Sequence, residues 1–327
     1  MAGSLLITGG KQRGDAVWHK EFRHYEKAML ARLDLATGKV TSVYEHVTPP
    51  HLCAEGSPSI VFKSATLTAD RLYLSTETEV LILGWPDLKL IYHLTHPSFN
   101  DVHHVTPHGE DLYVVSTGLD MVVRFDRNYQ AVEFLPVLDE APWSRFSPQT
   151  DWRRVASTKP HKAHPNFLFF LDDEPWVTRC ECRDAVKLRD FNQRIHVGVE
   201  RVHDGNVRQD QVEFTTVDGH VVYADARTHQ VTRVVPLAPM VRSDSMLGWC
   251  RGLHQEGALT YVGFSRLRPT RLFQNLRWLK HQITEREAPR EFLPTRVSAF
   301  DLQAGRLVRD YSLEEAEMAA VFSIIGV

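Results

Sequence analysis

A short hairpin motif recurs along this chain and restricts the folds that the chain can adopt. Each copy is a β-type segment that ends in Asp and is followed by a short turn and a β-branched run. Asp is favoured in such turns because its side chain accepts hydrogen bonds from nearby backbone amides. The copies are centred on Asp34, Asp87, Asp126, Asp190, Asp225 and Asp301. Repetition of one small β unit is typical of a repeat architecture.

The segments around the motif indicate a unit of four strands. An aromatic-rich strand ending in Ser or Thr lies upstream of most copies, and a further strand precedes it. We therefore predict an all-β fold, a six-bladed β-propeller, with seven blades as an alternative. Residues 1–327 are expected to form this single domain. A β-sandwich, or two smaller β domains, would be the other way to use so many short strands.

The two ends of the chain predict how the ring closes. Residues 4–10 supply a second strand that no first strand precedes, and residues 319–327 form an apolar strand that nothing follows. Pairing the two would complete the first blade and remove an exposed edge. Insertions are expected at about 140–160 and 266–294. Within the second, apolar residues at helical spacing predict a short helix at 271–283.

Composition excludes several classes of protein. Hydrophobic residues make up 43% of the chain and charged residues 24%, as in soluble globular proteins. The formal net charge of -3 argues against nucleic acid as the partner. No apolar run approaches the roughly 20 residues that cross a bilayer, so no membrane partner is expected. The beginning of the chain lacks the features of a signal peptide, and we expect a cytoplasmic protein.

Histidine is abundant, with 17 residues, and gathers where the inner strands of the blades are expected to begin. The inner strands of a propeller line its central channel. Counting back from the second strand of each blade places His104, His164 and His203 at similar depth. Neutral imidazole is the commonest metal-ligating side chain. We therefore predict a mononuclear metal site with the ligands His104, His164, His203 and His254.

The same channel positions suggest further functional residues. The candidates for acid–base catalysis or substrate contacts are His103, His161, Arg251 and Asp101. The predicted cofactor is a divalent metal, with Fe(II) favoured and Zn or Mn as alternatives, because imidazole suits all of these ions. A metal-free polar channel is the competing interpretation, since propeller channels also hold polar residues that bind only water and each other.

Part of this pattern resembles a known family. The sequence AHPN at 163–166, followed by an apolar run, is similar to an A-H-P-K segment of the carotenoid cleavage oxygenases. The pair His103 and His104 resembles one of their ligand strands. The resemblance implies a propeller whose iron is held by four His, one from each of four blades. That family has seven blades and a longer chain.

The repeats also resemble six-bladed lactonase and gluconolactonase-type propellers. Those proteins bind calcium through Glu, Asn and Asp. The channel positions here are mostly His, which argues against calcium, an ion that prefers oxygen ligands.

These observations predict a metal-dependent enzyme that acts on a small molecule. Iron would make it an oxygenase, while zinc or manganese would suit a lyase or hydrolase. The basic residues of 266–294 favour an anionic substrate, and 140–160, which enters directly before His161, is expected to form a pocket wall. The alternative is a non-catalytic propeller module that binds protein or glycan.

Overall fold

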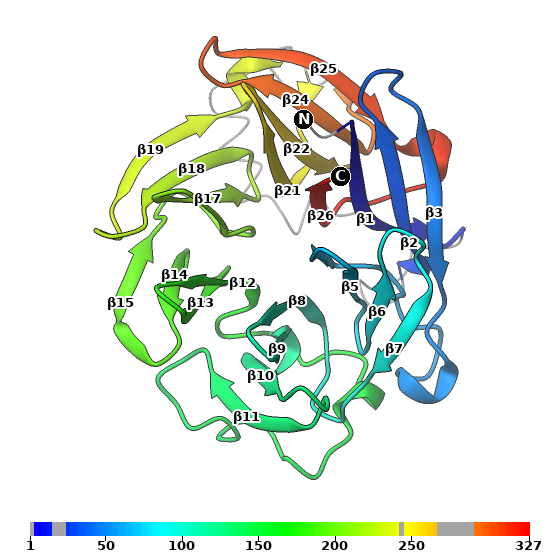
Figure 1. Cartoon of the computed structure of the whole chain (residues 1–327), viewed down its shortest axis with the longest axis vertical. Helices are drawn as coiled ribbons and strands as arrows, with labels where there is room; N and C mark the ends of the chain where they lie inside the picture. Colours follow the sequence, from blue (N-terminus) through cyan, green and yellow to red (C-terminus); the bar gives the residue numbers. More distant parts are fainter. Residues whose placement is uncertain (1–2, 15–23, 242–244, 267–290) are drawn as a thin grey trace.

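A computed structural model describes residues 3–14, 24–241, 245–266 and 291–327. Within these residues, six four-stranded antiparallel sheets stand around a central channel, as Figure 1 shows. The predicted six-bladed β-propeller is therefore confirmed. None of the described helices is long and apolar enough to cross a membrane. The helix expected at 271–283 falls outside the described residues.

The first three blades contain the first half of the chain and its last strand. From the channel outward, blade one consists of β26 (Ser323–Gly326), β1 (Ser4–Gln12), β2 (Tyr25–Asp34) and β3 (Val40–His46). Blade two consists of β4 (Ser64–Leu67), β5 (Arg71–Ser75), β6 (Val80–Gly84) and β7 (Leu90–Leu94). Blade three consists of β8 (Val102–His108), β9 (Asp111–Ser116), β10 (Met121–Phe125) and β11 (Ala131–Pro136).

The other three blades follow the same order. Blade four consists of β12 (Pro165–Leu171), β13 (Glu174–Arg179), β14 (Asp184–Lys187) and β15 (Asp190–His196). Blade five consists of β16 (Asn206–Arg208), β17 (Gln211–Thr216), β18 (His220–Asp225) and β19 (Val231–Pro236). Blade six consists of β21 (Trp249–Glu256), β22 (Leu259–Ser265), β24 (Arg296–Asp301) and β25 (Arg306–Ser312). A short parallel pair joins β20 (Ser245–Met246) to β23 (Glu291–Phe292).

The repeated Asp lies in or beside the turn between the third and fourth strands of each blade; in blade four, Asp190 is the first residue of β15. In blade one, Oδ1 of Asp34 accepts hydrogen bonds from the backbone N–H of Thr37 at 2.7 Å and from its hydroxyl at 2.8 Å. In blade three, Asp126 accepts from the backbone N–H groups of Asn128 and Gln130, both at 2.9 Å. The motif therefore recurs because each outer hairpin needs a side chain that satisfies its backbone donors.

The ring closes by pairing the two ends of the chain, as expected. β26 is antiparallel to β1, with Leu5 opposite Gly326 and Thr8 opposite Ser323. A Cβ atom at Gly9 would collide with the carbonyl oxygen of Ala320, so only glycine permits this close approach.

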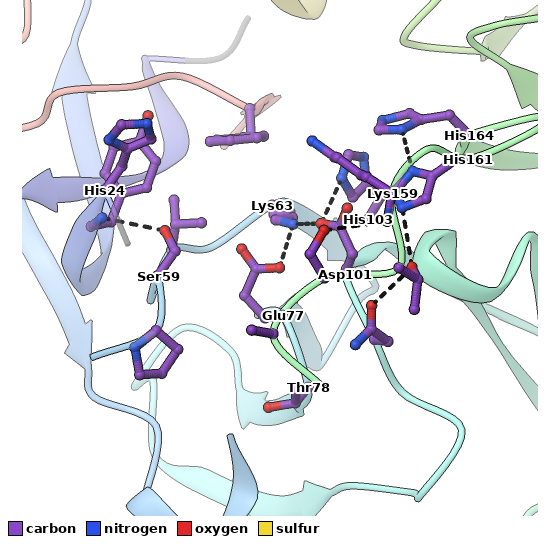
Figure 2. A pocket seen from close by; sticks show the side chains of 18 of the residues that line it. His24, Ser59, Lys63, Glu77, Thr78, Asp101, His103, Lys159, His161 and His164 are labelled. Atoms are coloured by element: carbon purple, nitrogen blue, oxygen red, sulfur yellow. Dashed lines mark hydrogen bonds and ion pairs between the residues drawn. The ribbon is translucent and has the colours of Figure 1, made fainter. Parts of the chain in front are cut away.

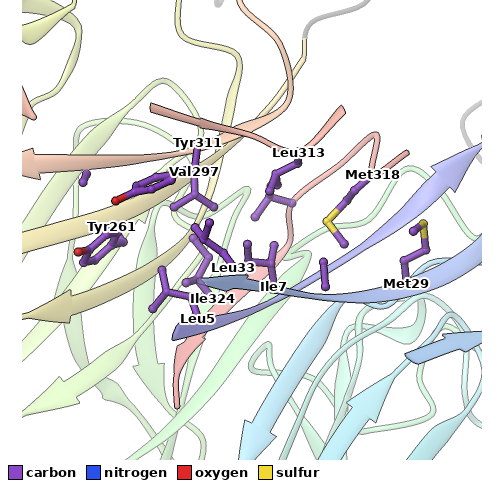
Figure 3. Close-up of a cluster of buried hydrophobic side chains, with 13 residues drawn as sticks. Leu5, Ile7, Met29, Leu33, Tyr261, Val297, Tyr311, Leu313, Met318 and Ile324 are labelled. Atoms are coloured by element: carbon purple, nitrogen blue, oxygen red, sulfur yellow. The ribbon is translucent and has the colours of Figure 1, made fainter. Parts of the chain in front are cut away.

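The apolar cores lie between neighbouring blades. Figure 3 shows the core at the closure, where Tyr261 and Val297 of blade six face Leu5 and Ile7 of blade one, with Ile324 beside them. All of these side chains are buried. The terminal strands are thus held by apolar packing as well as by backbone hydrogen bonds.

The insertion at 140–160 is irregular apart from a short 3-10 turn, η5 (Trp152–Arg154). Trp143, Phe146 and Trp152 pack against the buried apolar cluster between blades two and three. This packing fixes the path of the segment that leads into blade four.

Candidate functional site

A cavity of about 820 Å³ opens at one end of the channel. Residues from all six blades line it, because the inner strands begin at this end. The lining side chains that carry charge or imidazole are His24, Lys63, Glu77, Asp101, His103, Arg153, Lys159, His161, His164, Glu181, Arg201, Arg251 and Arg266. Residues 155–160 also line the cavity, which agrees with the pocket wall expected from the 140–160 insertion.

Three polar side chains of the cavity lie at equivalent points of successive blades. Lys63, Asp101 and His164 each directly precede an inner strand, β4, β8 and β12 respectively. Asp101 and His164 both have a φ of 53°, in the left-handed region that few non-glycine residues adopt. Non-glycine residues in this region are concentrated at functional sites, where the surrounding structure compensates for the strain.

An ion-pair network occupies one wall of the cavity (Figure 2). Nζ of Lys63 donates to Oε2 of Glu77 at 2.7 Å and also contacts Oδ1 of Asp101. Nε2 of His103 lies 3.2 Å from the same oxygen of Asp101. The Lys63 side chain is only 5% exposed. The side chains of Glu77 and Asp101 are 25% and 19% exposed, and they face the cavity. One buried ammonium group thus forms ion pairs with two carboxylates.

The two carboxylates titrate in opposite directions. Burial raises the pKa of Glu77 to about 7, and the Lys63 ammonium only partly offsets it. Burial also acts to raise the pKa of Asp101, but Lys63 and His103 outweigh it and hold that pKa well below its usual range. At neutral pH, Asp101 is therefore ionised and Glu77 carries a proton for part of the time.

The imidazoles beside this network are neutral at physiological pH. Burial, followed by the charge of Lys63, lowers the pKa of His103 to about 3. Burial, with His103 nearby, also places the pKa of His164 well below its usual value. Nδ1 of His161 lies 2.8 Å from Nδ1 of His164, so one of the two rings donates a hydrogen bond to the other. A neutral imidazole of lowered pKa accepts and donates hydrogen bonds but takes up a proton only weakly at neutral pH.

The structure brings most, but not all, of the predicted site residues together. Asp101, His103, His161, His164 and Arg251 line the cavity. The ring centroid of His103 lies 5.0 Å from that of His164.

His203 is buried directly behind this group, with its ring centroid 6.3 Å from that of His103. Both ring nitrogens of His203, and Nδ1 of His103, are buried without a hydrogen-bond partner among the described residues. Nδ1 of His203 lies 3.6 Å from Oδ1 of Asp204.

His104 and His254 lie apart from this group. The ring of His104 stacks on Phe167 with centroids 3.8 Å apart, and its Nδ1 accepts from the backbone N–H of Leu168. It lines a second cavity, of about 450 Å³, that is bordered by later residues of the inner strands. Nε2 of His254 lies 3.5 Å from Oε2 of Glu256. The expected common depth of His104, His164 and His203 is therefore not observed.

A backbone irregularity explains this difference. The register between β8 and β9 shifts between Val102 and His104, which is a β-bulge. A bulge inserts an extra residue into one strand and re-aims the side chains next to it. Counting residues along a regular strand assigned His104 to the cavity, whereas the bulged strand presents His103.

The metal prediction has no matching geometry in the described part of the chain. There, no group of three or more His, Cys, Asp or Glu side chains is arranged to hold a metal ion. Two nitrogens bound to one tetrahedral zinc ion lie about 3.3 Å apart. The Nδ1 atoms of His161 and His164 are closer, at 2.8 Å, as in a direct hydrogen bond. The metal ligands therefore stay a prediction.

The predicted site residues do not include Lys63, and they also do not include Glu77. Glu77 lies in the turn between β5 and β6, two residues beyond Ser75, the last residue of β5. Glu181 lies two residues beyond Arg179, the last residue of β13, and also lines the cavity. In most blades the sequence marks the end of the second strand with Ser or Thr. The turns that contain Glu77 and Glu181 could therefore have been located from this marker.

Comparisons with known proteins agree with the fold. The chain is similar to a protein of unknown function from Bacteroides caccae, with a TM-score of 0.62, 12% sequence identity and coverage of 99% of this chain and 98% of the other. It is also similar to a chain of the nidogen/laminin complex, with a TM-score of 0.56, 8% identity and coverage of 98% and 97%. No protein-family model and no curated protein sequence matches the chain. At these identities the likeness concerns the fold alone.

Proposed function

We propose that the cavity is the active site of an enzyme that carries out general acid–base chemistry on a small molecule. The observation that carries the proposal is the cluster of Lys63, Glu77, Asp101 and His103 on one cavity wall. Pairs of titratable groups whose surroundings separate their pKa values mark the acid and the base of many active sites. Such a constellation suits a lyase or a hydrolase.

The roles follow from the protonation states. His164, a neutral imidazole that lines the cavity and hydrogen-bonds His161, binds the substrate or a water through a hydrogen bond, because its lowered pKa makes it a weak base at neutral pH. Glu77, whose pKa is about 7, takes up a proton from the substrate when it is ionised and returns that proton to the leaving atom. Asp101 stays ionised and orients His103 through its contact with Nε2. Lys63 holds the two carboxylates in place.

A substrate screen tests this proposal. The purified protein is incubated with a mixed metabolite extract, and consumed and formed compounds are followed by mass spectrometry. The Asp101→Asn variant removes the charge but keeps a residue that tolerates positive φ. Asp173→Asn is the matched control, because Asp173 also has a positive φ, 61°, and is 95% exposed in the turn between β12 and β13. We expect consumption by the natural protein and by Asp173→Asn, but not by Asp101→Asn.

The metal-dependent enzyme is a second candidate, supported by one observation. Nδ1 of His103 and Nε2 of His203 are buried without a hydrogen-bond partner among the described residues. Such orphaned nitrogens are candidates for ligation of a divalent metal, with Fe(II) favoured and Zn or Mn possible. Elemental analysis after anaerobic reconstitution tests the idea. Equal metal content in the natural protein and a His164→Ala, His203→Ala double variant would count against it.

The metabolite screen also distinguishes a non-catalytic binding module from the acid–base enzyme and from the metal-dependent enzyme. A module that binds protein or glycan would leave every metabolite unchanged. One structural neighbour is a chain of a protein–protein complex. At 8% identity the similarity concerns the fold alone, so it does not favour this alternative.

A further inference from the structure

The cavity wall formed by blades five and six differs from the acid–base wall. Trp249 opens β21, and two guanidinium groups flank it. Cζ of Arg201 lies 5.7 Å from the centroid of the Trp249 ring, and Cζ of Arg251 lies 6.0 Å from it. Arg251 is also 4.7 Å from the ring centroid of Phe322. Aromatic faces attract a guanidinium and hold its plane in a fixed orientation.

Arg251 differs from the other arginines that line the cavity. Arg153 forms two hydrogen bonds of 2.8 Å with the carboxylate of Asp151, and Arg266 lies 3.3 Å from Glu314. Arg251 has no hydrogen bond or ion pair with any residue of the described chain, and its Nε is buried. An unpaired cationic donor in a partly desolvated cavity is costly unless a ligand satisfies it.

The two carboxylates of the ion-pair network do not neutralise this arginine. Glu77 and Asp101 are engaged by Lys63 on the facing wall. The nearest carboxylate to Arg201 belongs to Glu200, 3.5 Å away. Arg251 therefore presents to the cavity a positive charge that no carboxylate of the described residues pairs with. A planar guanidinium fork matches the two oxygens of a carboxylate or a phosphate.

We propose that Arg251, with Arg201 beside it, binds an oxyanion of the substrate, a carboxylate or a phosphate. This inference rests on the proposed function, because it names the substrate class of the same site. The anion on Arg251 would hold the molecule across the cavity and direct its reacting end toward Glu77. Binding energy from a part of the molecule that does not react then positions the part that does.

Binding of two simple anions tests the inference without knowledge of the substrate. Inorganic phosphate and malonate are titrated into the full-length protein at low salt, with calorimetry as the readout. We expect the natural protein to bind at least one of them, and the preferred anion identifies the oxyanion class. Arg251→Gln should weaken binding about 10- to 100-fold, the usual range for charge-assisted hydrogen bonds. Arg251→Lys keeps the positive charge but loses the planar guanidinium. Its anion affinity should lie between that of the natural protein and that of Arg251→Gln.

The matched control is Arg227→Gln. Arg227 is 79% exposed in an outer turn and pairs with Asp210, so its loss should leave anion binding unchanged. Far-UV circular dichroism and the melting temperature verify that each variant is folded. If Arg251→Gln does not fold, the anion affinity of Arg251→Lys is the test. The inference is then overturned if the lysine variant binds the anion as tightly as the natural protein does.

The outcomes separate this inference from the proposed function. It is overturned if neither anion binds the natural protein, or if folded Arg251→Gln binds as tightly as the natural protein does. Asp101→Asn should still bind the anion even though it loses turnover. If the anion binds through Arg251 but no metabolite is consumed, the proposed enzyme is wrong and the oxyanion site stands.

Discussion

The ammonium nitrogen of Lys63 lies 2.7 Å from Oε2 of Glu77 while it also contacts Asp101. A single buried cation is thus shared between two carboxylates of different blades, one following β5 and one preceding β8. This sharing keeps one carboxylate ionised and leaves the other close to its titration point at neutral pH. The acid–base proposal depends on that asymmetry.

Removal of the shared cation should destabilise the protein. Lys63→Met leaves two partly buried carboxylates without their lysine counter-charge, and this should cost somewhat less than the roughly 3–5 kcal/mol of breaking a fully buried pair. Urea unfolding at pH 7 should show this loss, and the loss should be smaller at pH 5, where the carboxylates take up protons more readily. An unchanged free energy of unfolding at both pH values would show that the Lys63 contacts contribute no stability.

Glu77 should make stability fall as the pH rises. Its pKa of about 7 lies above the ordinary value of 4.5, so the native state binds more protons than the unfolded state between those values. Stability contributed by this group is therefore present at low pH and is lost as the pH rises through about 7. Glu77→Gln should gain stability relative to the natural protein from pH 5 to pH 8. A difference that does not vary with pH would contradict the raised pKa.

Glu79 should show the opposite dependence. Burial acts to raise its pKa, but hydrogen bonds from His46, His93 and Thr48 outweigh it and lower the pKa to about 2. Its stabilising contribution is present above about pH 4.5 and is lost as the pH falls through about 2. We expect Glu79→Gln to cost about 3 kcal/mol at pH 7, from the size of the shift.

The comparison for Glu79 is a surface carboxylate of the neighbouring blade. Glu45 pairs with Lys27 at 2.6 Å and is 42% exposed, so Glu45→Gln should cost less than about 1 kcal/mol. Denaturant unfolding at pH 7 and pH 3 measures both variants. Equal costs for the two substitutions would mean that the His46 and His93 contacts do not stabilise Glu79.

The closure of the ring should depend on Ile324. This side chain is 4% exposed and packs in the core between blades one and six. Ile324→Ala should lower the free energy of unfolding by about 2–5 kcal/mol. Ile91→Ala, on the outermost strand of blade two and 54% exposed, should change it by less than about 0.5 kcal/mol. Similar effects of the two substitutions would show that the terminal strand is not part of the cooperative fold.

The fold could be predicted from the sequence because its signals are local. The Asp of each outer turn bonds to amides two to four residues away, as Asp34 and Asp126 show, so the motif survives in every blade. The closing strand could be predicted because residues 4–10 lack a preceding inner strand. Both inferences required only short-range chemistry and the count of strands.

The site could be predicted only in part, because its geometry depends on departures from regular strands. Strand β8 has a bulge between Val102 and His104, and Asp101 before it has a positive φ. As a result His103, and not His104, reaches the cavity. Glu77 joins the site through its partner Lys63, 14 residues earlier, and through Asp101 in the next blade. Such contacts depend on the arrangement of the blades in space, which a residue count along one strand does not contain.

The turnover number of Asp101→Asn, measured with a compound that the metabolite screen identifies, tests the acid–base site most directly. Loss of the charge that orients His103 should lower kcat by about 100-fold or more, the usual size of a general acid–base contribution. KM should change little if Arg251 continues to bind the substrate, and Asp173→Asn should match the natural protein. A kcat for folded Asp101→Asn equal to that of the natural protein would contradict the assignment of this cavity wall as the catalytic site.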